Sequence, residues 1–306
     1  SSGLPLLLTG STLQAWLKDS RVDLGAIGLF ALVGLPYTLK FLWSPLFDRF
    51  VPPFLGRRRG WMLCAQVAVA AAIAALGLGS PEERPWAVAL LALVVTFTSA
   101  SQDIVLDAYR RESLAEEELG PGSGIFVNGY RLAMLVSGAL ALALADLIPW
   151  RAVYLLMAAF MTVGAATTLL CREPEMDAPP PRTLREAVVE PFVEFFRRKG
   201  AWLILAFILL YKIGDQMASA MTTPFFLELG FSKTDIAAVV KAIGMASMIA
   251  GGFAGAYVML KVGIRRSLWA FGFLQAASIL AFAGLAQAGK VYGMLAAAVA
   301  LENLSF

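Results

Sequence analysis

The chain has 306 residues, of which 59% are hydrophobic and 15% are charged; its formal net charge is +3 and its mean hydropathy is +0.72. Average soluble domains hold roughly 25% charged and about 45–50% apolar residues, so this composition argues against a soluble enzyme. The sequence has no histidine, which excludes an imidazole base, a His-ligated metal and a Ser-His-Asp triad, and its two cysteines are too few for a cysteine-based metal framework.

The apolar residues fall into blocks of about 17–25 residues, close to the length that a helix needs to cross a bilayer. Breaks at charged residues and at Pro and Gly predict ten spans, which in chain order cover residues 1–17, 24–47, 61–79, 86–109, 124–146, 150–171, 201–227, 234–260, 267–286 and 291–306. The first and last blocks have no polar flank. We therefore expect an all-α membrane protein, and a fragment that lacks the first half-span and the C-terminal spans.

Lys and Arg are concentrated in alternate loops. Most of them lie in the loops after the second, fourth, sixth and eighth spans, at residues 48–60, 110–123, 172–200 and 261–266. Because cytoplasmic loops carry an excess of Lys and Arg, these four loops are predicted to face the cytoplasm.

The longest polar stretch divides the chain into two halves. We predict a six-helix N-terminal bundle at residues 1–171, a cytoplasmic linker at 172–200, and an incomplete C-terminal bundle at 201–306. Within the linker, Thr183 and Glu186 form a capping-box pattern, which predicts a short amphipathic helix on the inner membrane surface. Two bundles joined in this way indicate the plan of the major facilitator superfamily, in which the halves move around a site at the membrane midplane.

A weak internal repeat supports the two-bundle plan. The second span is followed by Gly56-Arg57-Arg58-Arg59, and the eighth span, its counterpart, is followed by Gly263-Ile264-Arg265-Arg266. The first of these loops, with Asp48-Arg49 before it, resembles the loop signature of the superfamily, although residues 50–55 lengthen it.

Charged residues within the predicted spans are the main functional signal, since each costs at least a few kcal/mol in lipid unless it is paired or faces water. Lys212 and Asp215 lie about 16–21 Å into the seventh span and are spaced to share a helix face. Glu302 is similarly deep in the tenth. A working site is favoured for these residues, and a purely structural ion pair is the alternative for Lys212 and Asp215.

In the fourth span, Ser99, Asp103 and Asp107 recur every four residues and Gln102 is adjacent. We predict that Gln102 and Asp103 face a central cavity. Asp107 is predicted to form an ion-pair lock on the cytoplasmic side, with Arg49 or Lys40 as its partner. Solvation of Asp107 close to the membrane surface is an equally open alternative.

The energy source is predicted to be an ion gradient. No Gly-rich phosphate loop of the Walker type occurs, which disfavours an ATP-driven pump. Asp103, Asp215 and Glu302 carry carboxyl groups that could take up a proton, and sodium is the alternative ion. Tyr130 and Tyr211 are available as aromatic faces for a sugar.

Several runs resemble the AmpG family of bacterial muropeptide permeases. They include Lys40-Phe41-Leu42-Trp43-Ser44-Pro45, Ser99-Ala100-Ser101-Gln102-Asp103-Ile104-Val105, Gly129-Tyr130-Arg131-Leu132, Tyr211-Lys212-Ile213-Gly214-Asp215 and Glu302-Asn303-Leu304. The resemblance implies a proton-driven importer in the bacterial inner membrane. Its cargo would be N-acetylglucosaminyl-1,6-anhydro-N-acetylmuramic acid and peptide-bearing forms, which feed cell-wall recycling and are linked to β-lactamase induction and antibiotic resistance.

The cargo of that family carries carboxylates, which Arg131, Lys212 and Lys241 could meet through charge-assisted hydrogen bonds. The predicted residues then form three sets. The substrate-binding set is Gln102, Asp103, Tyr130, Arg131, Tyr211, Lys212, Lys241 and Asn303; the proton-coupling set is Asp103, Asp215 and Glu302; the cytoplasmic gate is Lys40, Asp48, Arg49 and Asp107.

The expected partners are the muropeptide, protons and the lipid bilayer. We expect a monomer that binds no nucleic acid, cofactor or metal. Another oligosaccharide or an acyl-coenzyme cargo is the alternative. A membrane-embedded enzyme is disfavoured, because the sequence shows no nucleophile or catalytic pair.

Overall fold

A computed structural model describes residues 1–23, 27–28, 30–174, 181, 183–232, 235–236 and 239–305. Helices account for all the regular secondary structure of these residues, and no strand occurs among them. The chain divides into two compact units, one of Ser1–Ala115 with Gly129–Pro191 and one of Glu116–Asn128 with Phe192–Phe306. The predicted boundaries at residues 171 and 200 stay a prediction.

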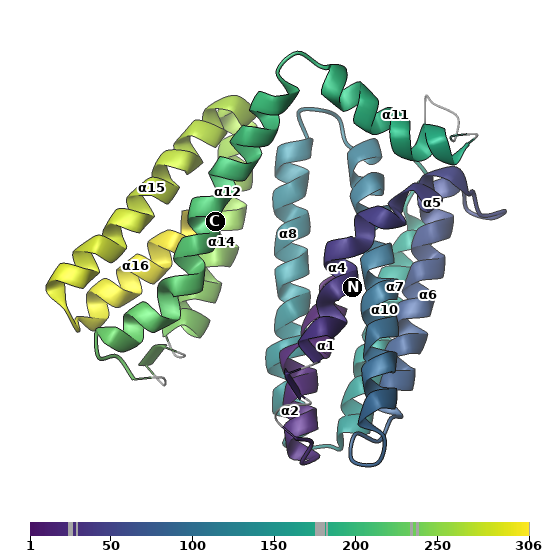
Figure 1. Cartoon of the computed structure of the whole chain (residues 1–306), viewed down its shortest axis with the longest axis horizontal. Helices are drawn as coiled ribbons and strands as arrows, with labels where there is room; N and C mark the ends of the chain where they lie inside the picture. The colour runs from purple at the N-terminus through teal and green to yellow at the C-terminus, as the bar shows by residue number, and fades with distance from the viewer. Residues whose placement is uncertain are drawn as a thin grey trace. The chain divides into compact units, whose positions relative to one another are not determined.

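The core of the first unit lies between three long helices, α6 (Arg57–Gly77), α7 (Pro85–Ser113) and α10 (Trp150–Leu170), with α6 packed against both of the others (Figure 1). Fully buried apolar side chains from each of them meet there, among them Ile73, Val95 and Met157. The last residue of α6, Gly77, lies against Tyr154, where a Cβ atom would come within 2.5 Å of the tyrosine Cβ. The small side chain therefore sets how closely α6 approaches α10.

The first two predicted spans differ from the expectation of single helices. The first consists of α1 (Leu4–Thr9) and α2 (Ser11–Asp19), which are separated at Gly10. The second consists of η1 (Phe30–Gly34), α4 (Leu35–Leu39), η2 (Lys40–Leu42) and α5 (Ser44–Arg49). Pro36 and Pro45 stand in the first turns of α4 and α5, where a residue without an N–H is tolerated, and each therefore marks the start of a new helix.

Helix α8 (Leu119–Leu135) continues through a π-helical turn, η3 (Val136–Leu140), into α9 (Ala141–Ala145). After α10, the linker contains α11 (Leu184–Arg197). Its first turn is capped by Thr183, whose hydroxyl oxygen accepts the backbone N–H of Glu186 at 3.1 Å. This contact is one half of the capping box that the sequence predicts.

The second unit is built from α12 (Ala201–Glu228), η4 (Val239–Gly244), α14 (Met245–Val262), α15 (Ile264–Ala288) and α16 (Tyr292–Ser305). Helix α16 packs against α14 and α15 (Figure 1). A second apolar cluster includes Phe226, Leu285 and Leu295. At Gly251 a Cβ atom would lie 2.5 Å from the carbonyl oxygen of Leu304, so a glycine is needed for α14 and α16 to come this close.

Among the described residues, six helical segments are long and apolar enough to cross a membrane: Arg57–Gly77, Pro85–Ser113, Leu119–Ala145, Trp150–Leu170, Met245–Val262 and Ile264–Ala288. They coincide with the third to sixth, eighth and ninth predicted spans. Shorter apolar helices cover Leu32–Leu42, Ala201–Leu210 and Tyr292–Leu304. The chain is therefore an all-helical, multi-pass membrane protein.

Candidate functional site

A polar cluster lies within the first unit, around Ser99, Ser101, Gln102 and Asp103 of α7. Ser99 and Gln102 are fully buried there. The phenol of Tyr37 donates a hydrogen bond to the hydroxyl oxygen of Ser99 at 3.0 Å, and the indole Nε1 of Trp43 donates to that of Ser101, also at 3.0 Å. Two polar contacts thus attach the irregular second span to α7.

Two acceptor atoms in this cluster have no donor within the part of the chain that the structure describes. The amide nitrogen of Gln102 donates to the hydroxyl of Ser1 at 3.3 Å, but its Oε1 is buried and without a hydrogen-bond partner among the described residues. The same holds for Oδ1 of Asp103. A buried polar atom without a partner costs about 1–3 kcal/mol, so both oxygens are suited to accept a hydrogen bond from a bound molecule, and the Asp103 carboxylate can also take up a proton.

The surroundings of Asp103 are charged and aromatic. Lys40 and Asp107 lie close enough to act on its carboxylate electrostatically, and its charge in turn acts on the phenols of Tyr37 and Tyr130. The structure thus brings together Gln102, Asp103 and Tyr130 of the predicted binding set with two members of the predicted gate.

The ion pair of Lys40 with Asp107 joins η2 to α7, with Nζ and Oδ2 3.8 Å apart. Asp107 also accepts a hydrogen bond from Arg110 at 3.1 Å. At 3.8 Å the two groups are too far apart for a hydrogen bond, and their side chains are 35% and 48% exposed. This contact is therefore weak enough to break and re-form readily.

A stronger network surrounds Arg58 at the start of α6. Its guanidinium donates to Oδ1 of Asp48 at 2.8 Å and to Oε2 of Glu112 at 2.7 Å, while its side chain is only 5% exposed. Arg57 lies 3.6 Å from the same Glu112 carboxylate. A planar guanidinium can serve two carboxylates at once, so this residue connects the ends of α5, α6 and α7.

The network changes the partners that the sequence suggests for the gate. Asp48 contacts Arg58, whereas the guanidinium of Arg49 lies 5.4 Å from the centre of the Phe50 ring. Neither Arg58 nor Glu112 stands out individually in the sequence. The run of three arginines after the second span was the available signal, but it does not show which arginine turns inward.

The other predicted residues are placed as follows. Arg131 is buried on α8, and Glu302 and Asn303 are half-buried neighbours on α16, where the Asn303 amide donates to the carbonyl of Val299 at 2.8 Å. The remaining four, Tyr211, Lys212, Asp215 and Lys241, belong to α12 and η4, but their side chains lie outside what the structure describes. Their predicted roles stay predictions.

Comparison with known proteins assigns the family. The sequence profile of the Major Facilitator Superfamily matches residues 3–305. The chain belongs to this superfamily. It is 47% identical over 306 residues to the anhydromuropeptide permease of Escherichia coli strain K12, an alignment that covers 99% of this chain and 62% of that protein. The predicted resemblance to the AmpG family is confirmed.

Two further relatives agree with this assignment. An uncharacterized protein of Haemophilus influenzae is 46% identical over 294 residues, which are 94% of this chain and 69% of that protein. A protein of Rickettsia felis whose name includes AmpG is 34% identical over 321 residues, covering 99% of this chain and 76% of its own length. The chain spans less than two thirds of the length of the E. coli relative.

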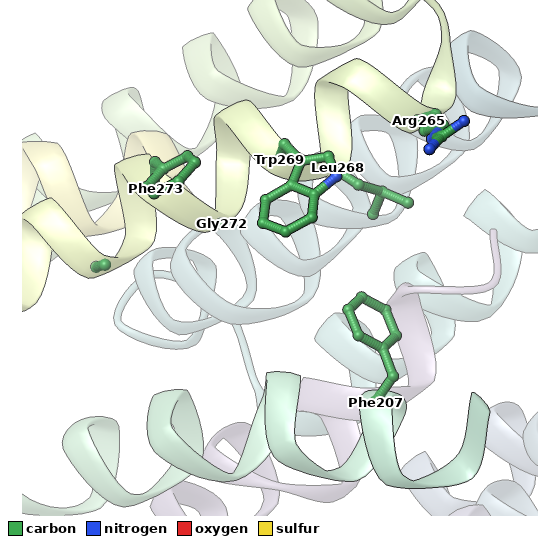
Figure 2. A pocket seen from close by; sticks show the side chains of 7 residues that line it. Phe207, Arg265, Leu268, Trp269, Gly272 and Phe273 are labelled. Carbon is green, nitrogen blue, oxygen red and sulfur yellow. The ribbon is translucent and has the colours of Figure 1, made fainter. Parts of the chain in front are cut away.

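A separate pocket in this superfamily member lies in the second unit between α12 and α15, with a volume of about 410 Å³. Figure 2 shows Phe207 of α12 opposite Leu268, Trp269 and Phe273 of α15, with Arg265 at one end. Its described lining is mainly apolar, and the indole N–H of Trp269 and the Arg265 guanidinium are the donors that it offers to a sugar. Among the residues that the structure describes, no group of three His, Cys, Asp or Glu side chains could hold a metal ion.

Proposed function

We propose that the protein containing this chain is a secondary active transporter of the bacterial inner membrane that imports N-acetylglucosaminyl-1,6-anhydro-N-acetylmuramic acid and its peptide-bearing forms by proton symport. The observation that carries the proposal is the half-buried Asp103, whose Oδ1 is buried inside a bundle of membrane-crossing helices and has no hydrogen-bond partner among the described residues. The cargo is suggested by the E. coli relative, which is named an anhydromuropeptide permease. Import would feed peptidoglycan recycling and, through its products, β-lactamase induction.

The polar cluster has the chemistry that such a cargo requires. Its hydroxyl and amide N–H groups are donors, and Oε1 of Gln102 and Oδ1 of Asp103 are acceptors to which none of the described residues donates. The phenol rings of Tyr37 and Tyr130 can pack against a sugar ring. Further binding residues in this proposal are Arg131, Tyr211, Lys212, Lys241 and Asn303. Asp215 and Glu302 are proposed as further proton-coupling residues.

The two charged networks are proposed to act as the cytoplasmic gate. The weak pair of Lys40 with Asp107 would break in each transport cycle, while Arg58 would hold Asp48 and Glu112 together when the cytoplasmic side is closed. This division follows from exposure, since desolvated and doubly bonded charges cost more to separate than exposed ones.

The proposal is tested by transport in liposomes. The natural polypeptide that contains this chain is reconstituted, and uptake of the labelled disaccharide is measured with and without an imposed proton gradient. We expect accumulation only with the gradient. Equal uptake without a gradient would exclude proton coupling, and the absence of uptake by folded protein, or stronger competition by another oligosaccharide or an acyl-coenzyme, would exclude the cargo.

In the same assay, Asp103→Asn is expected to reduce gradient-driven accumulation to the level of protein-free liposomes, because an amide accepts hydrogen bonds but does not take up a proton at this site. Exchange of labelled for unlabelled cargo across the membrane should persist. Asp146→Asn is the matched control, since Asp146 is an exposed residue at the end of α9. Undiminished accumulation by Asp103→Asn would contradict the coupling role.

A further inference from the structure

Glu173, near the beginning of the linker, caps a helix that lies more than a hundred positions earlier in the chain. One oxygen of its carboxylate, Oε1, accepts the backbone N–H of Arg58 at 2.7 Å, and the other, Oε2, accepts that of Arg59 at 2.9 Å. These N–H groups belong to the first turn of α6. Backbone N–H groups in a first turn have no acceptor within the helix, and they form the positive end of the helix dipole. A carboxylate that accepts two of them fixes the position of this helix end.

The contact is reciprocal. The side chain of Arg59 donates from Nε to the carbonyl of Thr168 at 3.0 Å, and from its terminal nitrogen to the carbonyl of Leu169 at 2.8 Å. Both carbonyls lie at the C-terminal end of α10, just before Glu173. The start of α6 and the end of α10 therefore cap each other.

The backbone at Gly56 makes room for the carboxylate. This residue precedes α6 with φ of +82°, and a Cβ atom there would lie 2.6 Å from the carboxyl carbon of Glu173. Arg172, the residue before Glu173, is also held in place. Its carbonyl accepts a hydrogen bond from the phenol of Tyr109 on α7 at 2.8 Å. The beginning of the linker is thus attached to both α6 and α7.

Arg58 takes part both in the contact with Glu173 and in the charged network of the gate. Its backbone N–H is held by Glu173, and its guanidinium reaches Asp48 and Glu112. We propose that Glu173 is a positioning residue of the gate: by anchoring the start of the linker to α6, it keeps Arg58 aligned between the carboxylates of α5 and α7. The proposal rests on the gate described under the proposed function. It adds that the linker takes part in holding the gate.

The test measures the geometry of the gate without cargo, so that its result does not depend on what the protein transports. In the natural polypeptide with its cysteines replaced, spin labels are attached to Phe50→Cys after α5 and Ser113→Cys at the end of α7. Both positions are exposed, and they flank the two helix ends that Arg58 joins. The distance distribution between the labels then reports on that junction.

We expect Glu173→Gln to broaden the distance distribution, because an amide accepts only one of the two N–H groups, and Glu173→Asp to broaden it less. Glu190→Gln, an exposed change of the same charge on α11, should leave it unchanged. In an Arg58→Gln background, Glu173→Gln should add nothing further, since the two residues would act through one contact.

A cap with only a structural role would lower the unfolding temperature but leave the distribution as narrow as in the unmodified protein, and that result would overturn the proposal. Additive broadening in the Arg58→Gln background would overturn it as well. If the protein failed to transport muropeptides while Glu173→Gln still broadened the distribution, the proposed cargo would be wrong and the positioning role would stand.

Discussion

Asp103 and Arg58 show two ways in which a charged side chain is accommodated in this chain. Arg58 is almost fully buried, and hydrogen bonds to two carboxylates compensate its charge, as a buried charge requires. Asp103 is surrounded by polar groups, yet no described residue donates to its Oδ1. The first arrangement is suited to holding helices together and the second to binding a proton or a cargo.

The Asp235 carboxyl is expected to make the stability of the folded protein depend on pH. Hydrogen bonds from the hydroxyl and backbone N–H of Ser232 and from the phenol of Tyr292 lower the pKa of the Asp235 carboxyl. A carboxyl with a lowered pKa in the folded state stabilises the protein above its unfolded pKa of about 3.9, and this stabilisation is lost as the pH falls through the folded pKa.

Tyr292→Phe should therefore unfold at a lower temperature than the unmodified protein at pH 7, and the difference should shrink below about pH 4. The measurement is the unfolding temperature in detergent between pH 7 and pH 3. Tyr257→Phe, at another exposed tyrosine, is the control and should show no such pH dependence. A difference that stays constant across the range would contradict the contribution of the hydrogen bond.

At the scale of helices, close packing depends on glycines at particular contacts. Gly77 and Gly251 each lie where a Cβ atom would come within 2.5 Å of an atom of a neighbouring helix, whereas Gly255 has only the ring of Phe271 nearby, at 3.6 Å. The sequence pattern pairs Gly251 with Gly255 as a small-residue motif. The structure assigns a close helix contact to the first of these and an ordinary van der Waals contact to the second.

Gly77→Ala is expected to destabilise the protein by about 1–3 kcal/mol, because the added methyl group must displace the Tyr154 side chain or separate α6 from α10. Gly129→Ala is the matched control, since its Cβ would meet nothing within 4 Å; it should be neutral or stabilising by up to about 1 kcal/mol. Chemical unfolding in detergent measures both. Equal effects of the two substitutions would show that contact with Tyr154 is not what matters.

At the scale of the whole molecule, the distribution of Lys and Arg predicts the orientation in the membrane. A cysteine at Glu190→Cys in the linker should react with an impermeant maleimide only in inside-out vesicles, and Lys290→Cys, between α15 and α16, only in right-side-out vesicles. Both positions are exposed. The opposite pattern would reverse the orientation and place the Arg58 network on the outer side.

The membrane class, the helical fold and the superfamily could all be predicted from the sequence. Block length, charge distribution and short motifs are properties of neighbouring residues, and a helix that crosses lipid must satisfy its backbone hydrogen bonds locally. The stripe of Ser99, Asp103 and Asp107 was likewise visible, because helical spacing alone places these residues on one face.

Only the tertiary structure decided which residues the charged side chains contact. Arg58 meets Glu112 across 54 positions of sequence, and its backbone meets Glu173 across 115. No local pattern distinguishes it from Arg57 and Arg59, and its position depends on how α6, α7 and α10 pack. The breaks in the second span depend partly on the sequence, because its prolines mark where new helices can start. The contacts of Tyr37 and Trp43 with α7 depend on tertiary structure, because these side chains reach α7 only when the short helices pack against it.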